Sequence, residues 1–159
     1  MVEHVLDTFT QVNFGQRIIV IGGVHQEDLI TLLQAWPTWD ICINARAAEG
    51  MGTSIAVGAK MLREAAGVFV CPADMPRIQP SDVDATADLF DGPTSICRPM
   101  FRGKPGHPVL FGRAHFARLQ ELRGDEGGAA ILRNSPSLMT FNATNPGVVA
   151  DIDHPQTLL

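Results

Sequence analysis

The chain has 159 residues, of which 45% are hydrophobic and 18% charged, and its formal net charge is −5 at pH 7. This composition is typical of one compact soluble domain, residues 1–159, that can bury a core. The acidic balance and the lack of a basic tract argue against a nucleic-acid-binding surface. No apolar run approaches the roughly 18 residues of a membrane span, and the first residues lack the order of a signal peptide. We therefore expect a cytoplasmic protein without membrane contact.

Hydrophobic periodicity predicts helices and strands in alternation up to about residue 90. Val2, Val5, Leu6 and Phe9 recur at helical spacing, which predicts a helix from the first residue onward that no Ser, Thr, Asp or Asn caps. Strands at 17–23, 39–44 and 67–71 are each followed by a helix, at 26–34, 50–64 and 80–90. This alternation indicates an α/β fold with a parallel sheet.

The pattern changes after residue 94. Strands are predicted at 94–101 and 109–111 around a Gly/Pro-rich turn, and again at 138–141 and 148–152. Short helices are predicted at 115–122 and 126–133. The three cysteines, Cys42, Cys71 and Cys97, are far apart and match neither a disulfide framework nor a metal-ligand pattern, so we expect reduced core thiols.

Asp74 follows the predicted strand at 67–71 almost directly, just past its carboxyl end. Open α/β sheets bind ligands at that edge, and a carboxylate there can hold Mg²⁺ against a triphosphate. The alternative is that Asp74 caps the next helix. The segment alone supports the two interpretations equally.

Two acids near the end of the chain, Asp151 and Asp153, alternate with an apolar residue, which places both carboxylates on one side of the predicted strand. One of these two carboxylates, together with that of Asp74, would complete a Mg²⁺ site made of two carboxylates. In the alternative interpretation, Asp153 caps a terminal turn.

Two further clusters have residue types that bind anions. The turn Gly50-Met51-Gly52-Thr53-Ser54 joins a strand to a helix, where glycines let a ligand approach free backbone N–H groups, although such turns also occur for geometric reasons alone. Arg98, Arg102, Lys104 and His107 bring positive charge to one region of an acidic chain, and the alternative is a solvated hairpin tip. His107 has no acid nearby in the sequence, which favours a positioning role over that of a base.

Five motifs follow one another across nearly the whole chain: Asn44 with Glu49-Gly50-Met51-Gly52-Thr53-Ser54; Ala73-Asp74-Met75-Pro76; Arg98-Pro99 with Gly106-His107-Pro108-Val109-Leu110-Phe111; Gly124-Asp125 with Gly127; and Asp151-Ile152-Asp153-His154-Pro155. This set resembles the motifs of the molybdenum cofactor cytidylyltransferase family, within the larger group of MobA-like nucleotidyltransferases. The resemblance implies a three-layer Rossmann-like nucleotidyltransferase fold with a mainly parallel sheet.

The resemblance also implies an activity, which is transfer of CMP from CTP, or of another NMP from its NTP, to molybdopterin with release of pyrophosphate. Asp74 and Asp153 would be the catalytic Mg²⁺ ligands, with Asp151 close behind. Asn44, Gly50, Met51, Gly52, Thr53 and Ser54 would contact the base and ribose. Arg98, His107 and Pro108 would line the side that receives the pterin phosphate, and another phosphorylated acceptor, such as a sugar phosphate, is the alternative.

The chain departs from the family pattern at its start and at Ala129, where an arginine is usual. The first strand and the glycine-rich signature LAAGxSxRMG, which cradles the triphosphate, are absent. The resemblance therefore implies an N-terminally truncated domain of very low activity, or a catalytically silent domain that binds a nucleotide or cofactor. Because the missing strand is central in the family, we also expect an exposed sheet edge, through which the chain forms a homodimer, binds a partner chain or aggregates.

Overall fold

The structure, a computed structural model, describes residues 1–133 and 135–152. The chain forms two compact units. The first unit comprises residues 1–13, 66–113 and 136 onward, and the second comprises residues 14–65 and 114–135. Among the described residues, no helix is long and apolar enough to cross a bilayer.

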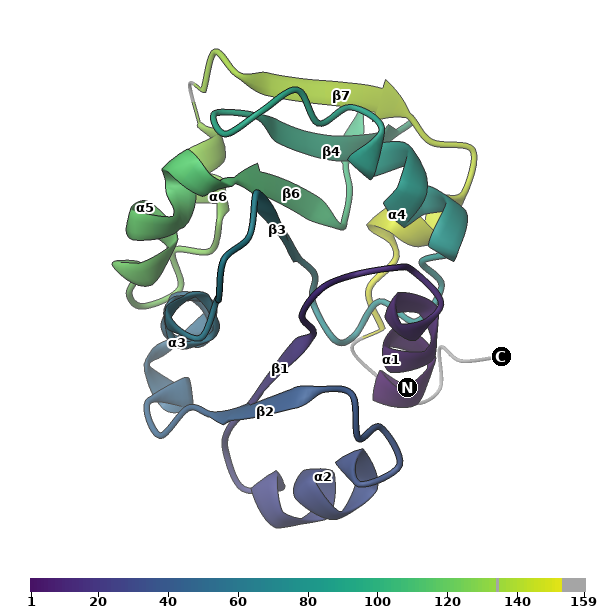
Figure 1. Ribbon diagram of the computed structural model, residues 1–159. Coiled ribbons are helices and arrows are strands. Elements are labelled where there is room, and N and C mark those ends of the chain that lie inside the picture. Colours follow the sequence, from purple (N-terminus) through teal and green to yellow (C-terminus); the bar gives the residue numbers. More distant parts are fainter. Residues whose placement is uncertain (134, 153–159) are drawn as a thin grey trace. The chain divides into compact units, whose positions relative to one another are not determined.

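The first unit contains a five-stranded sheet in the order β3-β6-β4-β5, with β7 paired to β4 (Figure 1). Its strands are β3 (Gly67–Val70), β4 (Ile96–Phe101), β5 (Lys104–Pro105), β6 (Val109–Gly112) and β7 (Leu138–Asn142). The helices of this unit are α1 (Val2–Thr10) and α4 (Pro80–Ala87), together with the 3-10 helix η3 (Pro146–Val149). All four residues of β6 are buried, whereas all four residues of β3 are partly exposed.

The second unit is built on the parallel pair β1 (Ile18–Ile21) and β2 (Asp40–Ile43). Its helices are α2 (Gln26–Leu33), α3 (Met51–Lys60), α5 (Phe116–Gln120) and α6 (Ala129–Leu132). The 3-10 helix η1 (Ala47–Glu49) precedes α3, and η2 (Arg113–His115) precedes α5. Helix α3 packs against both α5 and β1.

Each unit has its own apolar core. In the first unit Val83, Ile96 and Val148 have no exposed surface, and in the second Leu119 and Leu33 are 0% and 2% exposed. Cys42 and Cys97 are buried free thiols, as predicted, whereas the free thiol Cys71 belongs to a half-buried residue and not to the fully buried core.

The predicted helices and strands are confirmed over most of the chain, but the sheet is less parallel than expected. Only the pairs β1–β2 and β4–β7 are parallel, whereas β3–β6, β4–β6 and β4–β5 are antiparallel. A tight turn at Arg102 and Gly103, both with positive φ, reverses the chain after β4. Strands β5 and β6 therefore run back along β4, as a hairpin requires.

The strand predicted at 148–152 is wrong, because residues 146–149 form the 3-10 helix η3. The Asn145 side chain accepts a hydrogen bond from the Gly147 N–H at 2.8 Å, and Pro146 occupies the first position of the turn. A capped turn that begins with proline therefore overrides the strand preference of Val148 and Val149.

The buried side chain of Phe111 on β6 provides a test of the first unit's core. Phe111 is 1% exposed. Because truncation leaves a cavity, Phe111→Ala should lower the free energy of unfolding by about 3–5 kcal/mol in urea denaturation. Val24 is 94% exposed, so Val24→Ala should change it by less than about 0.5 kcal/mol. Equal effects of the two substitutions would contradict the packing described here.

Candidate functional site

Asp74 lies in the loop that leaves the carboxyl end of β3. Met75 and Ile78 are 4% and 3% exposed, so apolar burial anchors this loop on the first unit. The Oδ1 atom of Asp74 is buried and has no hydrogen-bond partner among the described residues. An unpaired buried carboxylate oxygen is costly, which makes this atom a suitable ligand for a hard divalent cation.

Asp74 is not the cap of the following helix, so that alternative is wrong. The N-cap of α4 is Gln79, and its backbone N–H donates to Asp82 Oδ2 at 2.9 Å in a capping box. Pro80 begins the helix, where its missing N–H costs nothing. The Asp74 carboxylate is therefore left without a structural role in α4.

The end of the described chain lies beside the Asp74 loop. The Ile152 N–H donates to the Asp74 carbonyl oxygen at 2.9 Å, and Asp151, one residue earlier, is exposed. Asp153 lies outside the described residues, so the shared Mg²⁺ site of Asp74 and Asp153 stays a prediction. Within residues 1–133 and 135–152, no group of three or more His, Cys, Asp or Glu residues gathers closely enough to hold a metal ion.

Cys71, between β3 and Asp74, does not act as a nucleophile. Burial raises the pKa of its thiol to about 12, and the Asp74 carboxylate acts in the same direction. The reactive form of cysteine is the thiolate, which is scarce at neutral pH when the pKa is this high. Cys71 is therefore not a candidate nucleophile.

The predicted basic cluster of the first unit divides into two parts. Arg102 and Lys104 are exposed at the hairpin tip, where the Arg102 guanidinium lies 5.3 Å from the centre of the Phe101 ring. Arg98 is half-buried, and its Nε and Nη2 donate to the Gly106 carbonyl oxygen at 3.2 and 2.8 Å. These two hydrogen bonds therefore stabilise the turn that contains His107.

His107 is held in this turn by its backbone, and the peptide bond to the buried Pro108 is cis. Its N–H donates to the Val148 carbonyl oxygen at 2.7 Å, and its buried Nδ1 has no partner among the described residues. Desolvation, assisted by the nearby Arg98 charge, lowers the pKa of His107 to about 4, although a hydrogen bond with the Val70 backbone opposes the shift. His107 is therefore neutral at pH 7.

The turn before α3, in the second unit, is organised by Asn44. Asn44 is 2% exposed, and its Nδ2 donates to the hydroxyl oxygens of Thr53 and Ser54 at 2.9 and 3.0 Å. Its Oδ1 accepts the Arg46 N–H at 2.9 Å. These bonds fix the start of α3 against the end of β2.

The glycines of this turn are required by packing. A Cβ at Gly50, where φ is +119°, would lie 2.3 Å from the Gly124 carbonyl carbon, and one at Gly52 would lie 2.8 Å from the Arg123 oxygen. The Gly52 N–H donates to the Gly124 oxygen at 2.7 Å and the Thr53 N–H to the Gly50 oxygen at 3.2 Å. The expectation of free N–H groups is therefore wrong at Gly52 and Thr53. Met51, by contrast, is 54% exposed.

A pocket of about 370 Å³ lies between α3 and α5 in the same unit. Asn44 and Thr53 line one part of it, which connects it to the turn just described. Arg46, Lys60 and Arg123 also line it, and sequence reasoning did not single out these three residues. The sequence did offer one local signal, because Lys60 is the only basic residue in the last turn of α3. Its proximity to Arg123 could not be predicted, because it depends on the fold.

The lowered pKa of His107 makes the stability of the protein depend on pH. The unfolded chain takes up a proton near pH 6.5 and the folded chain only near pH 4, so acidification favours the unfolded state in this window. Between about pH 7 and pH 4.5, uptake of this proton by the unfolded chain should lower the free energy of unfolding by about 2 kcal/mol. His107→Gln should flatten this part of the profile measured by urea denaturation. His4→Gln, at an exposed position on α1, should keep the wild-type profile, and an unchanged slope in H107Q would contradict the burial argument.

Known proteins resemble this chain in sequence and in fold. The purine catabolism protein PucB of Bacillus subtilis (strain 168) is 26% identical over 122 residues, which are 74% of this chain and 58% of PucB. The chain therefore spans little more than half the length of this curated relative. A nucleotidyl transferase from Methanothermobacter thermautotroptrophicus matches with a TM-score of 0.78 at 16% identity, over 96% of this chain and 74% of that one.

A crystal structure of Rv0371C from Mycobacterium tuberculosis H37Rv in complex with manganese matches with a TM-score of 0.77 at 22% identity, over 98% of this chain and 81% of that one. These structures confirm the predicted α/β nucleotidyltransferase fold class. The family model of the MobA-like NTP transferase domain matches residues 1–139. By this match over most of its length, the chain belongs to the MobA-like NTP transferase domain family.

Proposed function

We propose that the protein is a nucleotidyltransferase that moves a nucleoside monophosphate from an NTP to a phosphorylated acceptor. The observation that carries this proposal is the buried, unpartnered Asp74 Oδ1 at the carboxyl end of β3, within a chain of the MobA-like family. Triphosphates are generally handled by proteins as complexes with a divalent cation held by one or two carboxylates. The manganese complex of Rv0371C supports a divalent cation in this fold.

Asp74 would hold the cation, with Asp153 or Asp151 as the second carboxylate. The backbone hydrogen bond from Ile152 to Asp74 supports this pairing, because it holds the chain next to both acids beside the Asp74 loop. A bound Mg²⁺ or Mn²⁺ would supply charge neutralisation at the phosphates. An acceptor phosphate oxygen would form a bond to the α-phosphorus as the bond to the β-phosphate oxygen breaks, and pyrophosphate would leave.

Arg98 and His107 would act on the acceptor side by positioning. The Arg98 guanidinium keeps donors beyond those used on the Gly106 oxygen, and these suit a phosphate oxygen. Neutral His107 offers Nδ1 as a hydrogen-bonding atom without adding charge. Pro108 fixes the backbone next to it. Neither side chain is required to carry a proton.

The finer proposal is that CTP is the donor and molybdopterin the acceptor, with Mg²⁺ as the cation. It rests on the ordered motifs at Asn44 to Ser54, Asp74 to Pro76 and Gly106 to Phe111. Asn44, Gly50, Met51, Gly52, Thr53 and Ser54 would then form the nucleotide side. Exposed Met51 is the residue of this turn best placed to meet a ligand, because Gly52 and Thr53 use their N–H groups internally.

A pyrophosphate-release assay tests the substrates directly. CTP, GTP and ATP would each be offered with molybdopterin and, in a parallel series, with a sugar phosphate. Highest turnover with CTP and molybdopterin is the expected result. Nucleotide binding without any pyrophosphate release would favour the alternative, a domain that binds a nucleotide or cofactor without catalysis.

The metal role of Asp74 can be measured without turnover. Asp74→Asn keeps the shape of the side chain and removes its charge, so the dissociation constant for Mn²⁺ in isothermal titration calorimetry should rise at least about tenfold. Nucleotidyl transfer, where it is detected, should fall about 100-fold or more.

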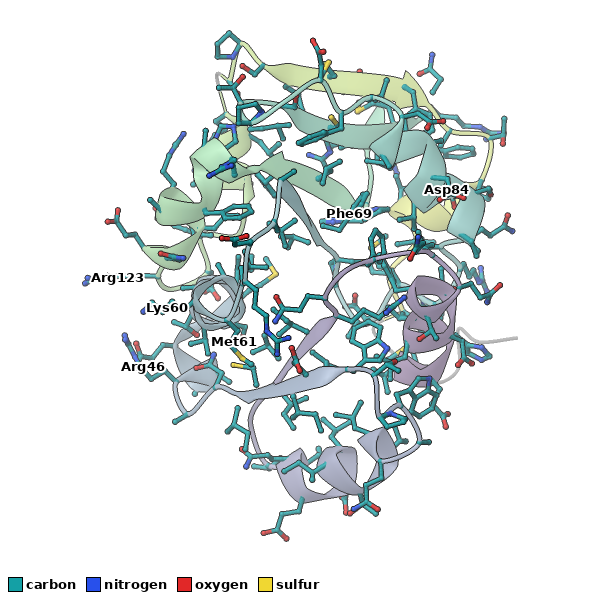
Figure 2. The ribbon with its side chains drawn as sticks, in the orientation of Figure 1. Arg46, Lys60, Met61, Phe69, Asp84 and Arg123 are labelled. Carbon is teal, nitrogen blue, oxygen red and sulfur yellow. The ribbon has the colours of Figure 1, made fainter. Side chains whose placement is uncertain are left out.

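Asp84→Asn is the matched control. Asp84 lies exposed on α4 in the same unit, as Figure 2 shows. This substitution should leave Mn²⁺ affinity and transfer unchanged. Wild-type Mn²⁺ affinity in D74N would overturn the assignment of Asp74 as a metal ligand.

A further inference from the structure

The pocket between α3 and α5 has the size of a small-molecule site. Its volume of about 370 Å³ lies within the range of small-molecule sites, which is about 300–1,000 Å³. All of its lining residues belong to the second unit. Asp74, Arg98 and His107 do not line it, whereas Asn44 and Thr53, which belong to the proposed nucleotide side, line one part of it. The proposed transfer assigns no role to the cations Arg46, Lys60 and Arg123.

The rim of this pocket is cationic in a protein whose net charge is −5. Arg46, Lys60 and Arg123 line it, and Figure 2 shows their side chains on the same outer side of α3. Among the described residues, Lys60 and Arg123 form no salt bridge, whereas the Arg46 Nη2 lies 2.5 Å from Glu49 Oε2. Two cations are therefore available to a ligand.

Part of the lining, which we call the apolar floor, consists of mostly small apolar side chains. Ala56 and Val57 line it from α3, and Ala117 from α5, with Leu122 beyond that helix. Ala56 and Leu122 are 6% and 8% exposed, so they form a packed surface and not a set of mobile side chains. A compact organic group can lie on such a surface while a charged group remains at the rim.

The charge of the lining favours an anion. Three cationic side chains line the pocket, of which Arg46 is paired with Glu49. The other two, Lys60 and Arg123, exceed the one lining carboxylate, Glu121, by one charge. A phosphate monoester carries about −1.5 to −2 charges at pH 7 and three acceptor oxygens. Guanidinium and ammonium groups bind such oxygens through charge-assisted hydrogen bonds.

We propose that the pocket between α3 and α5 binds a small phosphate monoester, with its phosphate group between Lys60 and Arg123 and its organic part on the apolar floor. Both a nucleoside monophosphate and a sugar phosphate have this chemistry. The inference does not rest on nucleotidyl transfer, since its phosphate contacts are Lys60 and Arg123, to which the proposed transfer assigns no role, although the pocket adjoins the proposed nucleotide side at Asn44 and Thr53.

Calorimetric titration of the purified chain at low salt would test the pocket with four probes: inorganic phosphate, CMP, glucose 6-phosphate and cytidine. We expect saturable binding of at least one of the two monoesters, with a dissociation constant of about 1 mM or lower, and no binding of cytidine. The tighter monoester would identify the source of the organic part. Binding of cytidine as tightly as CMP would overturn the proposal, because the phosphate would then contribute nothing.

Variants locate the binding. Lys60→Ala and Arg123→Ala should each weaken monoester binding about three- to tenfold, and the double variant should weaken it further. Arg118→Ala removes an exposed cation from α5 that does not line the pocket and should leave affinity unchanged. Equal losses in R118A and in the single pocket variants would show a non-specific charge effect and overturn the proposal, as would unaltered binding in the double variant.

Asp74→Asn separates this proposal from the proposed function. Monoester binding without added metal should persist in D74N, whatever happens to its Mn²⁺ affinity. Loss of monoester binding in folded D74N, verified by an unchanged urea midpoint, would overturn the separate site. Failure of all the probes to bind at up to about 10 mM would overturn it as well, and would leave the Asp74 proposal to its own Mn²⁺ titration.

Discussion

The position of the candidate metal site depends on hydrogen bonds that hold the chain after β7 against the loop after β3. Asn145 Nδ2 donates to Asp82 Oδ2 at 2.6 Å and to the Arg77 carbonyl oxygen at 2.9 Å. Further along, the Ile152 N–H donates to the Asp74 oxygen at 2.9 Å. The bond to the Asp82 carboxylate is of the stronger, charge-assisted kind. These hydrogen bonds therefore bring segments that are distant in sequence together beside Asp74.

The unsatisfied polar atoms of the first unit lie in the loops that follow its strands. The Asp74 loop continues β3, and His107 forms a hydrogen bond with Val70, the last residue of that strand. Each side chain has one buried atom without a partner among the described residues. Buried polar atoms without a hydrogen-bond partner are rare in proteins, except where a ligand, water or ion binds to them. These loops therefore remain available for binding, while the buried strand β6 provides rigid support.

The second unit uses polar residues in a different way. Asn44, Thr53 and Ser54 satisfy one another, so their main contribution is to fix the start of α3. Close approach of the backbone at Gly50 and Gly52 then brings the segment at 123–125 onto this turn. That packing positions cationic residues from separate segments around a single pocket. The two units thus present opposite chemistry, a carboxylate suited to a cation and cationic side chains suited to a phosphate.

Most of the helices and strands could be predicted from the sequence, because hydrophobic periodicity and turn residues act between neighbours in the chain. The sequence also placed Asp74 just beyond a strand, and its ordered motifs indicated the broader MobA-like nucleotidyltransferase group. It did not determine the antiparallel pairing of β3 with β6, the capped turn at Asn145, or the pocket that joins Lys60 to Arg123. The turn had a local signal in its Asn-Pro pair. The pairing and the pocket had none, because they form only when distant segments pack together, and the free energy of that packing is decided by the tertiary structure.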